Sequence, residues 1–244
     1  MSVKIVALSD THTKHKKLAI PECDILIHCG DFSWTGKYYE VTNFLRWFQD
    51  QPAKHKILIA GNHEETFDST HKRFMPHIPK LLENYDINYL ENSSVTIEGI
   101  KFYGTPWTPR FYDWGFNGLE GPDAVFQEAE GNNPHLRDIY SKIPDDTNVL
   151  ICHGPTYNVL DMNDNGTRCG SVEMSKLLDS GRLAQLHLYL CGHIHEARGH
   201  DIFYGGINFC NVSSLGRDYE TVSPPVTIYL DESGSVNSVE GYEK

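Results

Sequence analysis

Positive charge is scarce in this sequence. Its 244 residues hold 21 Lys and Arg against 33 Asp and Glu, which gives a formal net charge of −12 at pH 7. A long phosphate backbone binds proteins mainly through clustered cations, and the sequence has no basic stripe. We therefore expect no long nucleic acid as a partner, which disfavours a nuclease. An anionic substrate would need a local cationic site.

Long apolar runs are also missing. No run reaches the ~18 residues of a membrane-spanning helix, and the first ten residues, MSVKIVALSD, have too short an apolar stretch for a secretory leader. We expect a cytoplasmic chain with no membrane partner. Because no repeat, low-complexity tract or linker divides it, we also expect a single domain over residues 1–244. The six cysteines are expected to be mostly buried thiols in a reducing compartment. Composition leaves the oligomeric state open.

What the sequence does contain is a series of apolar runs rich in β-branched residues. Such near-continuous runs suit strands that are covered on both faces. Candidate helices lie between them, and this alternation predicts a mostly parallel sheet with crossover helices. The runs are 3–9, 24–30, 55–61, 148–154 and 186–192, and the candidate helices are 37–50, 64–83, 134–142 and 171–180.

A second group of runs alternates apolar and polar residues and is separated by glycine turns. Alternation with tight turns is typical of antiparallel hairpins. Together the two groups predict an α/β fold in which two mixed sheets pack against each other, with helices outside. The alternating runs are 94–99, 101–106, 200–206, 207–213 and 225–231.

Each of the five buried runs ends in polar residues. One such ending is ordinary turn chemistry, but ligands of open α/β sheets bind at the carboxyl ends of strands, so five endings together predict a shared site. In the last of them, His193 and His195 are two residues apart, which places both imidazoles on one side of an extended chain. The converging residues are Asp10, His12, Asp31, Asn62, His63, Glu64, His153, His193 and His195.

The residue types indicate metal chemistry. Carboxylate, imidazole and amide ligands suit Mn²⁺ first, with Fe, Zn²⁺ or Co²⁺ as alternatives, rather than a thiolate-bound zinc. Without His63 and Glu64, seven of these residues are candidate ligands. Seven are too many for one ion but fit two divalent ions that share a carboxylate, an arrangement used in phosphoryl chemistry. Two such ions, two aspartates and a hydroxide would leave a charge of about +1, so a negatively charged protein could still bind a phosphate ester.

The order of the motifs carries a resemblance. D-x-H (Asp10, His12), G-D (30–31), G-N-H-E (61–64), H-G (153–154) and G-H-x-H (192–195) resemble the signature of the calcineurin-like metallophosphoesterase superfamily. The resemblance implies a four-layer α-β-β-α sandwich with two metal sites. It implies that Asp10, His12, Asp31 and His195 hold one ion, and that Asp31, Asn62, His153 and His193 hold the other.

Within the superfamily, the chain is most similar to small metallophosphoesterase-domain proteins related to class III cyclic nucleotide phosphodiesterases. The similarity rests on GTPWTPRFYDWGFN (104–117), HGPTYNVLD (153–161) and NFCNVSSL (208–215). One departure from the protein serine/threonine phosphatases is clear. Where those have G-D-x-x-D-R-G, this chain has GDFSWTG, with Trp34 and Thr35 in place of Asp and Arg. A protein phosphatase is therefore disfavoured.

The same departure leaves open which group orients His63, the residue expected to give a proton to the leaving oxygen. Glu64 is the nearest candidate in the sequence, although an acidic residue there would also suit the first turn of a helix. A hydroxide held by both ions is the expected nucleophile, since coordination lowers the pKa of water.

Aromatic and arginine residues outside the motifs are candidates for substrate contacts. Trp107 and Arg110 could form a wall for a nucleobase or aryl group, with Arg198 and Arg217 as weaker candidates. The long segment 106–147, punctuated by Gly, Pro and Asn, is expected to form a lid of loop and helix.

The sequence thus predicts a phosphodiesterase with a dinuclear metal centre that acts on small cyclic nucleotides or aryl phosphodiesters. A broad phosphomonoesterase or a nucleotide pyrophosphatase is the alternative, because the same cluster serves all three reactions. A metal-binding scaffold without turnover is the alternative from another class of protein.

Overall fold

The first sheet is built around the three N-terminal apolar runs. In the computed structural model, which describes residues 2–121, 124 and 133–242, these runs form neighbouring parallel strands. Two C-terminal strands extend the sheet, the first antiparallel to the N-terminal strand and the second antiparallel to the first. The strands, in their order across the sheet, are β14 (Val236–Glu240), β13 (Val226–Leu230), β1 (Val3–Leu8), β2 (Cys23–His28), β3 (Ala53–Leu58) and β4 (Asn88–Tyr89).

The second sheet has a parallel centre and an antiparallel strand at each edge. Its buried central strands include the late apolar runs, whereas the edge strand on one side is exposed. The strands, in order, are β11 (Gly199–Phe203), β12 (Ile207–Asn211), β10 (Leu188–Cys191), β9 (Val149–Cys152), β6 (Ile100–Thr105) and β5 (Ser93–Ile97).

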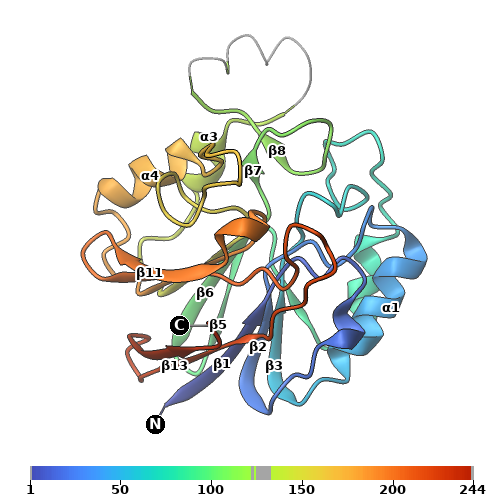
Figure 1. Cartoon of the computed structure of the whole chain (residues 1–244), viewed down its shortest axis with the longest axis horizontal. Helices are drawn as coiled ribbons and strands as arrows, with labels where there is room; N and C mark the ends of the chain where they lie inside the picture. The colour runs from blue at the N-terminus through green and yellow to red at the C-terminus, as the bar shows by residue number, and fades with distance from the viewer. Residues whose placement is uncertain (1, 122–123, 125–132, 243–244) are drawn as a thin grey trace.

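The two sheets face each other across an apolar core. Ile5 and Ile27 from the first sheet, and Phe102 and Ile151 from the second, belong to one buried cluster between the sheets. A second cluster joins their outer faces to the helices. In Figure 1, α1 lies on one side of the molecule and α3 and α4 lie on the other. The α-β-β-α sandwich is therefore confirmed.

The helices are short and have identifiable ends. In α4, for example, the hydroxyl of Ser171 accepts a hydrogen bond from the Met174 amide at 3.2 Å and caps the first turn. The remaining small elements lie in the connections. The helices are α1 (Tyr38–Gln49), α3 (Leu136–Tyr140), α4 (Val172–Asp179) and the 3-10 turns η1 (His15–Lys17), η2 (Pro79–Asn84) and η4 (His195–Ala197), and a small parallel pair joins β7 (Thr108–Pro109) to β8 (Asn117–Gly118).

One predicted helix is wrong. Residues 64–83 form successive turns, and regular structure begins only at η2. Two causes act locally: Pro76 and Pro79 cannot donate backbone hydrogen bonds, and the Asp68 carboxylate accepts the Thr70 amide in an Asx turn. The other three predicted helices match α1, α3 and α4 to within a few residues. The short strands β4, β7 and β8 and the terminal β14 were not predicted.

The predicted lid over 106–147 falls partly outside the described residues, since 122–123 and 125–132 are not among them. Its described part contains β7, β8 and α3. Its role as a lid and the single-domain organisation both stay predictions. Within the described residues, no helix combines the length and apolar character needed to cross a membrane.

Candidate functional site

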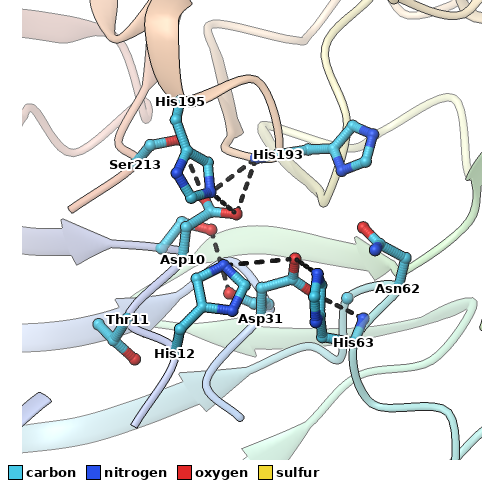
Figure 2. Close-up of polar contacts among 12 residues, drawn as sticks. Asp10, Thr11, His12, Asp31, Asn62, His63, His193, His195 and Ser213 are labelled. Carbon is cyan, nitrogen blue, oxygen red and sulfur yellow. Dashed lines mark hydrogen bonds and ion pairs between the residues drawn. The ribbon is translucent and has the colours of Figure 1, made fainter. Parts of the chain in front are cut away.

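The polar residues that follow five strands meet at one edge of the sandwich. The loops after β1, β2 and β3 come from the first sheet, and the loops after β9 and β10 come from the second. The site therefore lies where the carboxyl ends of the parallel strands of the two sheets approach each other. In Figure 2, Asp10 and Asp31 point toward the same region, with His12, His63 and His195 around them.

Asp31 lies at the centre of the cluster. Its Oδ2 atom is 3.3 Å from His153 Nε2, and 3.9 Å from the Nε2 atoms of both His12 and His63. Its Oδ1 atom accepts the backbone amide of His63 at 2.8 Å. The side chain is almost fully buried. One carboxylate thus faces three imidazoles that come from different loops, as a shared ligand would.

Asp10 organises the other half of the cluster. Its carboxylate lies 3.4 Å from His195 Nε2 and accepts the His193 amide at 3.0 Å and the Ser213 hydroxyl at 2.9 Å. Ser213 was not predicted from the sequence, although it lies within the NFCNVSSL stretch that carries the resemblance. Its hydroxyl also contacts Asn211 Oδ1, whose amide group binds the Ile194 carbonyl and holds the 192–195 loop in place.

Backbone carbonyls orient the imidazoles. His12, His63, His153 and His195 each place Nδ1 within 2.8–3.3 Å of a carbonyl oxygen. A carbonyl can only accept a hydrogen bond, so each Nδ1 carries a proton, and each ring in its neutral form directs an unprotonated Nε2 into the cluster. This is the tautomer that a metal-binding histidine needs, and such outer contacts commonly orient metal ligands.

The charges of the cluster are matched to cation binding. Burial acts to lower the pKa of His153, but the Asp31 carboxylate, through its charge and its hydrogen bond, raises it to about 9. Burial is the main cause that lowers the pKa of His12 to about 3 and that of His193 to about 4. Imidazole binds metal in its neutral form. Metal binding by His153 would therefore release a proton, and low pH would oppose it.

The donor atoms fit two cations. The trios Asp10, His12, His195 and Asp31, His153, His193 each place one donor atom per residue within 4.8 Å of the others. Asn62 Oδ1 lies 3.0 Å from His153 Nε2 and adds an oxygen beside the second trio. His12 Nε2 is buried without a hydrogen-bond partner, which is costly unless a further group binds it. The structure thus brings all seven predicted ligands together, and their assignment to two ions stays a proposal.

The backbone at these residues is unusual. Asp10, His12, Asp31 and His193 have positive φ angles of 54°, 38°, 56° and 67°. Residues other than glycine rarely adopt this region, and it is found where the surrounding structure enforces a conformation. Gly192 shows how close the loops approach, since a Cβ there would lie 2.1 Å from Asp10 Oδ2. Gly192 and Gly61, where a Cβ would lie 2.3 Å from Asp31 Oδ1, therefore make room for the two carboxylates.

The predicted role of Glu64 is wrong in one respect. Its carboxylate does not contact the His63 ring, which is oriented instead by the Trp34 carbonyl at 2.9 Å. Glu64 is fully buried and accepts four hydrogen bonds: the amides of Asp31, Ser33 and Gly61 and the Ser33 hydroxyl, all at 2.7–2.9 Å. The residue fastens the G-D loop to the G-N-H-E turn. It acts on the site by fixing the backbone at Asp31.

Replacing Glu64 by alanine should therefore destabilise the protein whether or not metal is bound. The change leaves three buried amides and one hydroxyl without their acceptor, and we expect a loss of about 3 kcal/mol in the free energy of unfolding. Urea denaturation of the metal-free chain measures it. Glu83→Ala, which removes an exposed glutamate from η2, is the control and should leave stability nearly unchanged. Unchanged stability of Glu64→Ala with reduced turnover would instead favour a catalytic role.

The predicted substrate contacts divide into two groups. Trp107 is buried in the core, with its ring perpendicular to that of Phe116 at 5.4 Å, and it does not line the site. Arg198 binds the carbonyls of Ser213, Pro224 and Gly241 and so holds together the segments that follow β12 and β14. Neither placement supports a substrate contact. Arg110 and Arg217, by contrast, line a cavity beside the site.

Aromatic rings that the sequence analysis did not single out surround the histidines. The Trp114 ring lies 4.1 Å from the His63 ring, and the Trp34 ring lies 4.7 Å from the His12 ring. Tyr219 contacts the rings of both His12 and His195, at 5.1 and 4.9 Å. Trp114 and Trp107 both belong to the stretch 104–117, and of the two it is the Trp114 ring that lies against an imidazole of the cluster.

Two cavities meet at the cluster. The first, here called the arginine cavity, has a volume of about 550 Å³ and is lined by Arg110, Arg168 and Arg217 together with two glutamates. The second, here called the aromatic cavity, has a volume of about 540 Å³ and reaches Asp31, Asn62 and His63. Its rings are Trp34, Phe111, Trp114 and Tyr219. Phe111, His193, His195 and Tyr219 line both cavities.

Comparison with known proteins gives a match to a family model and matches to several curated proteins. The family model described as calcineurin-like phosphoesterase matches residues 3–197. The human protein named metallophosphoesterase domain-containing protein 1 is 35% identical, with 93% of this chain and 71% of that protein aligned. A UPF0046 protein of Caenorhabditis elegans is 30% identical, with 93% and 75% aligned.

Solved structures agree on the fold. A dimetal phosphatase from Danio rerio superimposes with a TM-score of 0.51 at 12% identity, covering 93% of this chain and 92% of that protein. At this level of identity the likeness concerns the arrangement of sheets and helices alone.

Proposed function

The chain belongs to the calcineurin-like phosphoesterase family, and on that basis we propose that it hydrolyses small phosphodiesters, with cyclic nucleotides and aryl phosphodiesters as the first substrates. Membership of the family supports metal-dependent hydrolysis of phosphoesters at a dinuclear centre. The preference for diesters is the further step, and the shape of the site supports it.

The residues of the cluster have distinct tasks in this proposal. Asp10, His12, Asp31 and His195 would hold one divalent ion, and Asp31, Asn62, His153 and His193 would hold the other. Bound there, the ions would supply positive charge for the phosphate and a nucleophile from water near neutral pH. His63, whose Nδ1 donates to the Trp34 carbonyl, would give a proton to the leaving oxygen from Nε2.

The observation that carries the preference for diesters is the pair of cavities. A phosphate monoester needs space for one organic group, whereas a diester of two separate alcohols, such as an aryl phosphodiester, needs space for two. The arginine cavity and the aromatic cavity each exceed 500 Å³ and share a wall at His193 and His195. A phosphorus atom bound at the cluster could therefore direct one ester group into each cavity.

Hydrolysis of bis(p-nitrophenyl) phosphate and p-nitrophenyl phosphate with added Mn²⁺ tests the proposal. We expect the diester to be the better substrate by kcat/KM. A clear preference for the monoester would favour the broad phosphomonoesterase, and preferential cleavage of nucleoside diphosphates would favour the pyrophosphatase. Two bound ions per chain without turnover of any of these esters would favour the scaffold. Comparing Mn²⁺ with Fe²⁺, Zn²⁺ and Co²⁺ in the same assay identifies which ion supports turnover.

A further inference from the structure

The two cavities differ in chemistry, and the residue that would protonate the leaving group lines only one of them. His63 and Asn62 line the aromatic cavity and are absent from the lining of the arginine cavity. An ester group that enters the aromatic cavity therefore places the oxygen that joins it to phosphorus on the same side as His63. The cavity that an ester group occupies would decide whether it leaves or stays.

The aromatic cavity is suited to a flat group. Trp34 and Trp114 have partly exposed rings near His63, with ring centres 6.0 and 4.1 Å from the imidazole. The Trp34 ring also contacts Tyr219 at 5.2 Å, and all three rings line the wall of the aromatic cavity. Stacking of flat rings on such walls is favourable and tolerant of the ring's identity.

The Trp114 ring is held firmly in this wall by its loop. The amide of Gly115 donates to the Asn62 carbonyl at 3.0 Å, and the amide of Phe116 donates to the buried Asp68 carboxylate at 2.7 Å. A Cβ atom at Gly115 would lie 3.1 Å from the Glu65 backbone, which is closer than most side chains approach a neighbouring backbone. The loop that carries Trp114 is thus attached to the same turn that carries His63.

We propose that, in diesters of two separate alcohols, the ester group expelled from phosphorus is planar and aromatic and binds in the aromatic cavity, while the retained group occupies the arginine cavity. This inference rests on the proposed function. In the step, water adds its oxygen to phosphorus, the P–O bond to the aromatic alcohol breaks, and His63 gives that oxygen a proton. One proton of the water restores His63 and the other passes to solvent. The products are an aromatic alcohol and the phosphomonoester of the other alcohol.

A mixed diester tests the inference through its product ratio. Benzyl cyclohexylmethyl phosphate carries a flat ring and a saturated ring of similar size on alcohols of similar acidity. We expect cyclohexylmethyl phosphate to exceed benzyl phosphate by about tenfold, the scale of one stacked ring, as measured by ³¹P NMR with the Mn²⁺-loaded protein. Equal amounts, or an excess of benzyl phosphate, would overturn the inference while leaving phosphodiester hydrolysis intact.

Variants locate the preference. Trp114→Leu should bring the ratio close to one, and Trp34→Leu should lower it severalfold, whatever happens to the total rate. Tyr38→Leu, which removes an exposed ring from the start of α1, is the matched control and should keep the wild-type ratio. An unchanged ratio in both tryptophan variants would show that the aromatic cavity does not select the leaving group. If the protein hydrolysed neither this ester nor bis(p-nitrophenyl) phosphate, the proposed function itself would be rejected, and the inference with it.

Discussion

Replacing Asp31 by asparagine is expected to remove both metal ions and to lower turnover by at least about a hundredfold, the scale at which a single preorganised electrostatic group acts. Asp31 Oδ2 faces the imidazoles of His12, His63 and His153 within 3.9 Å. Asparagine has nearly the same shape but no charge, and its amide cannot serve as a shared anionic ligand. Both proposed sites lose the same ligand, so both should weaken together.

Metal content per chain, measured by plasma mass spectrometry after dialysis, checks this expectation independently of activity. Asp24→Asn is the matched control because it removes one negative charge at the start of β2, away from the site, where Asp24 pairs with Lys54. The control should retain two ions and wild-type turnover. Two ions retained by Asp31→Asn would contradict the shared-ligand assignment, and one ion retained would show that Asp31 serves a single site.

The sequence predicted the site better than it predicted some of the fold. Residues such as Asp10 and His153 directly follow buried apolar strands, so the pattern of strands was enough to place them at one edge. The helix that was wrongly predicted over 64–83 shows why part of the fold could not be predicted. Its residues are held by distant partners, as when Asp68 accepts the amide of Phe116, 48 residues away. Such contacts leave no periodic signal in the sequence.

The supporting groups around the site were beyond prediction for a related reason. The Trp34 carbonyl orients His63, and any residue type supplies a carbonyl at that position. Glu64 accepts hydrogen bonds from backbone amides of residues up to 33 positions away, which its place in the sequence does not indicate. Ser213 and Tyr219 reach the cluster only because β12 lies next to β10. Sequence order therefore shows the ligands that follow strands but not the outer groups that orient them.

Replacing His63 by alanine should separate proton donation from metal binding. An alkyl phosphodiester has a poor leaving group that needs a proton, so its turnover should fall by about a hundredfold or more. A p-nitrophenyl ester leaves as a stable anion, so its turnover should fall much less. The backbone amide of His63, which binds Asp31 Oδ1, is unaffected by the change, and metal content should stay at two ions per chain.

The metal measurement is essential because His63 Nε2 also lies 3.9 Å from Asp31 Oδ2 and forms a candidate donor trio with His12 and Asp31. Loss of an ion in His63→Ala would make the residue a ligand rather than a proton donor. Equal losses with both esters and full metal content would mean that the imidazole stabilises the phosphoryl group instead. His77→Ala, which removes an exposed imidazole, is the control and should change neither quantity. Only a loss that grows with the basicity of the leaving alcohol would assign His63 the proton, because that dependence is what general acid catalysis requires.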